Sequence, residues 1–168
     1  TTNPMRFPLS RDQRGMKVGL LGLIVILAAW TRIPGLGNKS LWYDEVTTLE
    51  YANACGGYDD LKAGVVMESP PDLTGLRSAG PWWKMWTCLG NTTHPPLHFV
   101  VLRLWRHLFG EGEVMARGLS TVCSLAAIPL LFLAARMLHG PTVALYASTF
   151  MAVAVPQVVF AQETRNYT

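Results

Sequence analysis

The chain has 168 residues and a formal net charge of +3, and half of its residues are hydrophobic while only 15% are charged. An average soluble domain carries roughly 25% charged residues, so this composition argues against a soluble enzyme and strongly against a disordered chain. Three cysteines are too few for a disulfide scaffold. At about 20 residues for each membrane span, a chain of this length has room for three or four spans.

The first apolar segment follows a basic tail. Residues 1–17 carry four basic residues and one acid, whereas Val18–Trp30 carry no charge. We predict a first transmembrane helix over 18–36, in which Arg32 extends toward water at the membrane surface. A cleaved signal peptide has similar basic and apolar parts, but Thr31–Pro34 offers no clean small-residue cleavage site. Because basic residues favour the cytoplasmic side, the 1–17 tail is predicted to be cytoplasmic.

The next segment, 37–93, is predicted to be an exoplasmic acidic loop. Seven of the eleven acidic residues of the chain lie within residues 34–93. Loops of this length are usually functional or disordered. Three tryptophans between positions 82 and 86 suit a membrane interface. They are equally consistent with a small hydrophobic cluster that packs the loop.

Residues 94–110 are apolar but short for a membrane span. Leu97–Phe109 would form about 20 Å of helix, whereas the apolar core of a bilayer is about 30 Å thick. Arg103, Arg106 and His107 have the spacing of one helix face, and the apolar residues follow the opposite face. We therefore predict an amphipathic helix at the outer membrane interface, with a short span as the alternative.

Two further transmembrane helices are predicted, over 114–138 and 142–161, and residues 162–168 are predicted to begin a second exoplasmic loop. The side on which Glu163 lies depends on the segment 94–110. If that segment is interfacial, Glu163 lies on the same side of the membrane as the acidic loop. If it spans the membrane, Glu163 faces the cytoplasm.

An adjacent pair of acids, Asp44 and Glu45, follows the first predicted span. A carboxylate close to lipid is partly desolvated, which tends to raise its pKa and suits a general base. The alternative is a pair of solvated acids that open a helix over 44–54, because acidic residues favour the first turn of a helix.

Two other positions are candidates for chemistry. His94 precedes a predicted helix and suits binding of a phosphate, a metal or the acidic pair, or alternatively helix capping. Glu163 and Arg165 follow the last predicted span, and the planar guanidinium of an arginine suits phosphate recognition. The alternative for this second group is an ordinary anchor at the membrane interface.

The order of these features resembles a known family. SLWYDE at 40–45 is followed by HPPLHFVVLRLW at 94–105, FGEGEVMARGLS at 109–120 and QETRNY at 162–167. This order is similar to the N-terminal part of the dolichyl-phosphate-mannose–protein mannosyltransferase-like superfamily. These are GT-C-fold, family-39-type glycosyltransferases, and the aminoarabinose transferase of lipid A is a relative. The resemblance implies an all-α integral membrane protein with a GT-C-like fold, about three transmembrane helices and an exoplasmic loop with interfacial helices.

The resemblance also implies an activity. Such enzymes transfer a sugar from a polyprenyl-phosphate donor to an acceptor hydroxyl or an amine-bearing acceptor on the exoplasmic face. Asp44 then corresponds to the general base, Glu45 supports it, and Glu163 is a second catalytic acid. Binding of the donor phosphate is expected from His94, Arg103 and Arg165. No cofactor is assigned. Carboxylates and a histidine are expected to converge, which would suit a divalent metal, whereas the resemblance implies metal independence, so a divalent metal is left open.

The expected partners are the polyprenyl-phosphate sugar, the bilayer and an acceptor glycan, lipid or protein. No basic and aromatic patch suggests nucleic-acid binding. We expect an integral protein of the plasma membrane, a bacterial inner membrane, with a cytoplasmic N-terminus. Family members are much longer, so the chain is interpreted as an N-terminal portion. The alternative function is a non-catalytic membrane subunit or a truncated remnant of the same fold.

The positions of the cysteines lead to one more hypothesis. Cys55 and Cys88 both fall in the predicted exoplasmic loop, where an oxidising compartment permits a disulfide. Cys123 falls within a predicted span and is expected to remain free.

Overall fold

The computed structural model describes residues 11–55, 64, 66, 68, 72–89 and 96–164. Over these residues every regular element is helical, so the predicted all-α fold class is confirmed. The elements are α1 (Arg11–Arg32), α2 (Tyr43–Ala52), the 3₁₀ helix η2 (Leu76–Ser78), α3 (Lys84–Cys88), α4 (Pro96–Phe109), α5 (Glu113–His139), α6 (Pro141–Val153) and α7 (Val155–Ala161).

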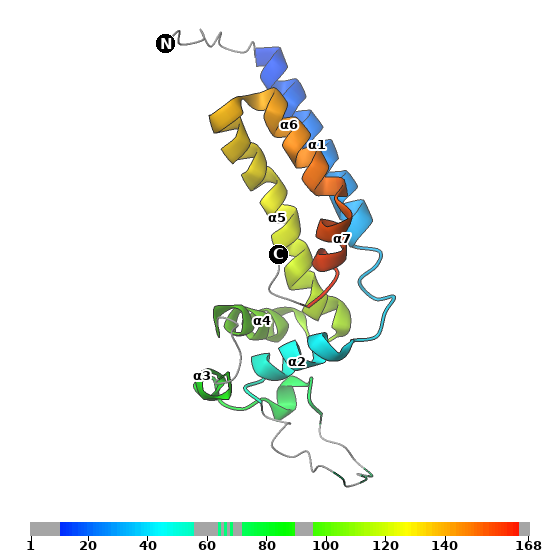
Figure 1. The fold of residues 1–168 in the computed structure, drawn as a ribbon, viewed down its shortest axis with the longest axis vertical. Helices are drawn as coiled ribbons and strands as arrows, with labels where there is room; N and C mark the ends of the chain where they lie inside the picture. The colour runs from blue at the N-terminus through cyan, green and yellow to red at the C-terminus, as the bar shows by residue number, and fades with distance from the viewer. Residues whose placement is uncertain are drawn as a thin grey trace.

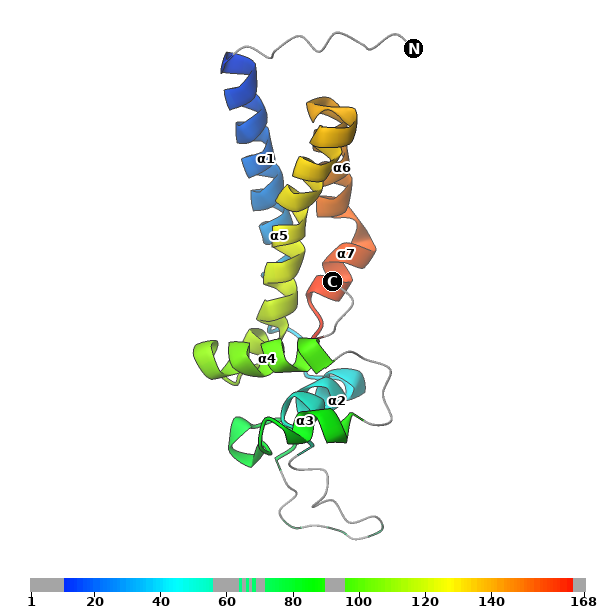
Figure 2. The same ribbon diagram turned by 90° about the vertical axis from the view of Figure 1, so that its left-hand side faces the viewer.

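The helices form two parts. In Figure 1, α1, α5 and α6 run side by side along the long axis of the molecule, and α2, α3 and α4 gather at one end. The start of α1 and the connection between α5 and α6 lie at the other end (Figure 1). Figure 2 shows α4 lying across the end of the helical bundle, with α2 and α3 beyond it. We call α2, α3 and α4 with the segments that join them the terminal unit.

Two of the described helices are long and apolar enough to cross a membrane, α1 over Gly15–Arg32 and α5 over its whole length. The bent pair of α6 and α7 passes the same criterion when it is counted as one span. The bundle core is small, with Ala28, Ile128 and Ala152 at its centre. Large apolar side chains on the outer faces remain exposed, as lipid contact requires. They include Leu23, Ile26, Trp30, Leu130, Tyr146 and Phe150.

The segment 142–161, expected as one continuous span, is divided into α6 and α7, which meet at an angle of 57°. Pro156 lies in the first turn of α7. Proline has no backbone N–H, so it cannot donate to the carbonyl of Ala152, four residues earlier, and its ring clashes with that carbonyl. The helix therefore breaks at this position. In contrast, α5 continues through Pro129.

Arg32 at the end of α1 satisfies the carbonyls that this break exposes. Its Nη1 donates to Ala152 O at 2.8 Å, its Nη2 donates to Met151 O at 3.2 Å, and its Nε donates to Ser124 Oγ at 3.1 Å. The expectation that Arg32 extends toward water is therefore wrong, because its side chain is fully buried between α1, α5 and α6. Unpaired backbone groups are costly in an apolar environment, and this cost favours the inward orientation.

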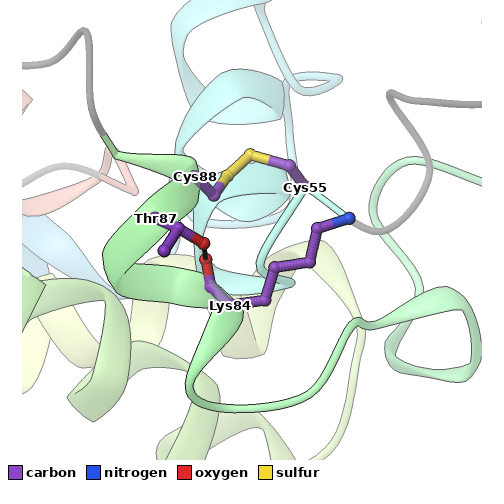
Figure 3. The surroundings of a disulfide bond; sticks show 4 residues. All are labelled: Cys55, Lys84, Thr87 and Cys88. Atoms are coloured by element: carbon purple, nitrogen blue, oxygen red, sulfur yellow. Dashed lines mark hydrogen bonds between the residues drawn. A yellow bond between two sulfur atoms is a disulfide. The ribbon is translucent and has the colours of Figure 1, made fainter.

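The terminal unit has its own hydrophobic core, in which Leu49, Met85, Phe99 and Leu102 are buried together with Leu119 of α5. The end of α2 is joined to the end of α3 by a disulfide between Cys55 and Cys88, whose Cα atoms are 6.1 Å apart (Figure 3). The hypothesised pairing is therefore present in the structure. Cys123 is free and exposed on α5.

The arginines of α4 point into the terminal unit. Arg106 is buried, and its guanidinium donates to Asn53 Oδ1 and to the carbonyl of Thr74. The Asn53 amide donates in turn to the carbonyl of Gly75 at 3.0 Å. The buried face of α4 thus holds the loop that precedes η2. Its exposed face is an apolar stripe of Leu97, Val101, Leu104 and Leu108.

Candidate functional site

A cavity of about 250 Å³ lies where the bundle meets the terminal unit. Three regions of the chain form its walls: the connection from α1 to α2 with the first turn of α2, the first turns of α5, and the end of α7 with the residues after it. These regions are far apart in the sequence, and helix packing alone brings them together. The described lining residues are Gly35, Lys39, Ser40, Trp42, Glu45, Arg117, Val159, Gln162 and Glu163.

A buried ion pair forms one wall of the cavity. Arg117 Nη2 lies 2.7 Å from Glu45 Oε2, and Arg117 Nε donates to Glu45 Oε1 at 2.8 Å. Both side chains are almost completely buried. Two parallel hydrogen bonds between a guanidinium and a carboxylate define the geometry as well as the charge balance. The start of α2 is thereby held against the first turns of α5.

The guanidinium of Arg117 also binds the backbone of the α1–α2 connection. Nη1 donates to the carbonyls of Leu36 at 2.8 Å and Lys39 at 2.7 Å, and Nη2 donates to that of Ser40 at 3.1 Å. Together with the two bonds to Glu45, these interactions engage all five N–H groups of an arginine. Arg117 therefore has no donor left for an incoming anion unless one of these bonds is broken.

The carboxylate of Glu45 connects the ion pair to the segment after α7. Its Oε1 accepts a hydrogen bond from the backbone N–H of Thr164 at 2.9 Å. Glu163 precedes Thr164 and contributes its side chain to the same cavity. The structure therefore brings together the first and last acidic motifs of the chain.

The two carboxyl groups have opposite pKa shifts. Burial alone would raise the pKa of Glu45, but hydrogen bonds from Arg117 and Thr164 and the charge of Arg117 hold that pKa below its ordinary value. Burial raises the pKa of Glu163, and the negative charge of Glu45 raises it further, although Lys39 and Arg117 partly oppose this. A cavity with one firmly ionised carboxylate and one more readily protonated carboxyl can both hold charge and exchange a proton.

Asp44 lies in the first turn of α2 and is half-buried. It is not among the described residues that line the cavity. Its neighbour Glu45 accepts from the N–H of Trp42 at 3.4 Å, so the acidic pair also stabilises the start of the helix. The structure therefore separates the two acids: Glu45 lines the cavity and Asp44 does not.

Of the residues expected to bind the donor phosphate, the structure describes Arg103, which does not line this cavity. Arg103 is buried in the terminal unit with its guanidinium 4.3 Å from the centre of the Trp82 ring, and it is not among the described lining residues. Among the described residues, its Nε and Nη1 have no hydrogen-bond partner. His94 and Arg165 lie outside the described residues. The phosphate-binding role of all three stays a prediction.

Sequence reasoning missed several residues of the cavity. Arg117 stands within the FGEGEVMARGLS motif, which carried a signal of family resemblance but not of this ion pair. Lys39 precedes the SLWYDE motif and Gln162 begins the QETRNY motif, and neither residue was assigned a role. Over the residues that the structure describes, no group of three or more histidine, cysteine or acidic side chains is arranged to hold a metal ion.

The fold and the cavity define a class of protein before any comparison: an all-α membrane protein whose polar site lies at one end of its membrane helices. Residues 93–167 match the family model described as dolichyl-phosphate-mannose-protein mannosyltransferase, which confirms the predicted GT-C-type resemblance over that part of the chain. The match points in general terms to membrane glycosyltransferase activity and membrane location. No curated protein and no solved structure matches the chain.

Proposed function

We propose that the chain functions in a membrane glycosyltransferase. The enzyme transfers a sugar from a polyprenyl-phosphate donor to a hydroxyl or amine of an acceptor on the exoplasmic face. The observation that carries this proposal is the cavity at the end of the membrane helices, where Glu45, Arg117 and Glu163 meet. The family match over residues 93–167 supports the same reaction class.

The chemistry that such a cavity needs is modest. A phosphate on a lipid is already a good leaving group, so catalysis depends on a positioned base and on compensation of charge at the departing phosphate. We propose Asp44 as the base that deprotonates the acceptor and Glu163 as the second acid. Glu45 then acts as a positioning residue, because its carboxylate is engaged by Arg117 and Thr164.

The donor phosphate needs a cation with free donors. Arg117 is fully engaged, whereas Lys39 is an exposed cation on the cavity wall. We propose that Lys39 contributes to phosphate binding together with the predicted residues His94, Arg103 and Arg165.

The proposed orientation combines the basic tail, which favours a cytoplasmic N-terminus, with the exposed face of α4. Its apolar stripe is exposed although its arginines are buried, which is the reverse of a helix on a soluble protein. We propose that this stripe contacts the outer leaflet and that α4 is interfacial. The cavity and the terminal unit are then exoplasmic, and the N-terminus is cytoplasmic, in the plasma membrane.

The test uses the full-length protein in lipid nanodiscs with a radiolabelled polyprenyl-phosphate sugar. Asp44→Asn and Glu163→Gln are each expected to lower the rate of transfer at least about 100-fold, the lower range for a general acid or base. Glu68→Gln is the matched control, because Glu68 is an exposed acid outside the cavity. Undiminished transfer by Asp44→Asn would remove that residue as the base. Donor binding without turnover in the wild type would favour the non-catalytic alternative.

A further inference from the structure

Four hydrogen bonds hold the end of α7 and the residues after it against the rest of the molecule. Thr121 Oγ1 on α5 donates to Ala161 O at 2.7 Å, and Thr164 N donates to Glu45 Oε1 at 2.9 Å. Between them, Gln162 Nε2 donates to the carbonyls of Thr31 at 3.1 Å and Arg32 at 3.0 Å. These two carbonyls are among the last four of α1, which have no partner within their own helix.

The Gln162 amide reaches these carbonyls across Gly35. A Cβ atom placed on Gly35 would lie 2.5 Å from Gln162 Nε2 and 2.7 Å from Gln162 Cδ, closer than real Cβ contacts allow. The φ angle of Gly35 is not in the left-handed region, so the backbone conformation does not require glycine here. The requirement comes from the close approach of the side-chain amide.

We propose that the contact between Gly35 and Gln162 positions Glu163 for the reaction. The absence of a side chain at position 35 lets the Gln162 amide cap α1, and this cap holds the next residue, Glu163, in the cavity wall beside Glu45. Gly35 and Gln162 are thus positioning residues that act through Glu163. This inference rests on the proposed function. It adds two residues that do not react themselves but determine where Glu163 lies.

The titration of Glu163 distinguishes a contact that positions Glu163 from a helix cap that only stabilises the fold. The described charged groups that influence Glu163 are Glu45 from α2, Lys39 from the α1–α2 connection and Arg117 from α5. Loss of a cap that only stabilises the fold would lower the unfolding temperature and leave these surroundings unchanged. Loss of a positioning contact would move Glu163 away from Glu45 and toward water, so its pKa would fall toward the ordinary value.

The variants are Gly35→Ala, Gln162→Ala and the double substitution in the full-length protein. Gly35→Ala is expected to preserve folding, because the atoms it displaces are the flexible end of Gln162. Gly37→Ala is the matched control: it adds the same methyl group to the same connection, but its Cβ would lie 3.3 Å from Val114 Cγ2 instead of meeting Gln162. We expect Gly35→Ala to lower kcat about tenfold or more, because small displacements of reacting groups are costly.

The readouts are the pH profile of sugar transfer and an infrared titration of the Glu163 carboxyl, whose band is assigned by its loss in Glu163→Gln. Gly35→Ala and Gln162→Ala should both lower the apparent pKa of Glu163. The double variant should show the same pKa and the same rate of sugar transfer as Gln162→Ala alone, because both substitutions remove one contact. Gly37→Ala should retain the wild-type profile.

Additive effects of Gly35→Ala and Gln162→Ala, or an unchanged Glu163 titration in both, would overturn the inference. An equal fall in kcat for Gly37→Ala and Gly35→Ala would also overturn the inference. The infrared titration does not require turnover. If sugar transfer is absent but the Glu163 band shifts as expected, the proposed function fails and the positioning contact stands.

Discussion

Glu45 and Arg117 are 72 positions apart in the sequence and form a two-point ion pair with an Nη2–Oε2 distance of 2.7 Å. The pair joins the first turn of α2 to the first turns of α5, and through Thr164 it also holds the segment after α7. Three elements of the candidate site therefore depend on one carboxylate. This arrangement explains why Glu45 organises the cavity although its neighbour Asp44 is the proposed base.

Loss of this ion pair should destabilise the protein. Glu45→Gln leaves the buried Arg117 without its charge partner, and breaking a buried pair in this way costs about 3–5 kcal/mol. Thermal unfolding in detergent micelles should show a large fall in midpoint. Glu113→Gln, which removes an exposed acid from the first turn of α5, should change the midpoint little. Equal midpoints for Glu45→Gln and the wild type would contradict a structural role for the pair.

The stability of the protein should depend on pH through Glu163. Its folded pKa is raised above the ordinary value of 4.5, so the stability it contributes is fully present below that value and is lost as the pH rises through the folded pKa. Glu163→Gln removes this loss. The variant should therefore gain unfolding temperature relative to the wild type as the pH rises above 4.5. If the gain in unfolding temperature of Glu163→Gln over the wild type becomes smaller as the pH rises, the pKa of Glu163 is lowered and not raised.

Glu45 should contribute to the loss of stability at acidic pH. Its folded pKa is lowered, so its contribution is present above the ordinary value of 4.5 and is lost as the pH falls through the folded pKa. Unfolding midpoints measured at decreasing pH should fall more steeply for the wild type than for Glu45→Gln. Parallel curves would exclude a stabilising role for the ionised carboxylate.

The disulfide should stabilise the terminal unit. The bridge closes a long loop from Cys55 to Cys88, and the chain-entropy model gives about 3–4 kcal/mol for a loop of this length. The double substitution of both cysteines by serine should lower the unfolding midpoint, and reduction should have no further effect on that variant. Cys123→Ser is the control, because Cys123 is free on α5. An unchanged free-thiol count after reduction of the wild type would exclude the bridge.

Arg32 should hold the break between α6 and α7. Arg32→Leu leaves the carbonyls of Met151 and Ala152 unpaired in an apolar environment, at about 1–3 kcal/mol for each group. Hydrogen exchange should therefore accelerate at the backbone amides of α7. Arg77→Leu, an exposed position on η2, should leave that exchange unchanged. Protection of α7 equal to the wild type in Arg32→Leu would show that other contacts hold the bend.

The apolar stripe of α4 should lie in the bilayer. A spin label at Leu104→Cys in the full-length protein, in a Cys123→Ser background, should be relaxed by oxygen more than by a water-soluble nickel complex. A label at Thr87→Cys, an exposed site on α3, should show the reverse. Preferential access of the nickel complex to position 104 would contradict membrane contact.

Much of the helical framework could be predicted from local patterns. Charge-free runs of suitable length predicted the membrane helices that correspond to α1 and α5, because hydropathy is a property of neighbouring residues. The apolar stripe of α4 follows from the same kind of periodicity. The division of the last expected span into α6 and α7 could not be inferred from Pro156 alone, because α5 continues through Pro129.

The sequence therefore determined the class of protein, its apolar helices and the order of its acidic motifs. Only the tertiary structure decided which charged side chains are buried and which are paired with other groups of the protein. Asp44 and Glu45 are adjacent and chemically similar, yet the packing of α5 pairs Glu45 with Arg117. Arg32 and Arg103 both resemble exposed cations in the sequence, yet both are buried. The partner of a charged group lies many residues away, and its distance depends on how the helices pack rather than on which residues precede or follow it.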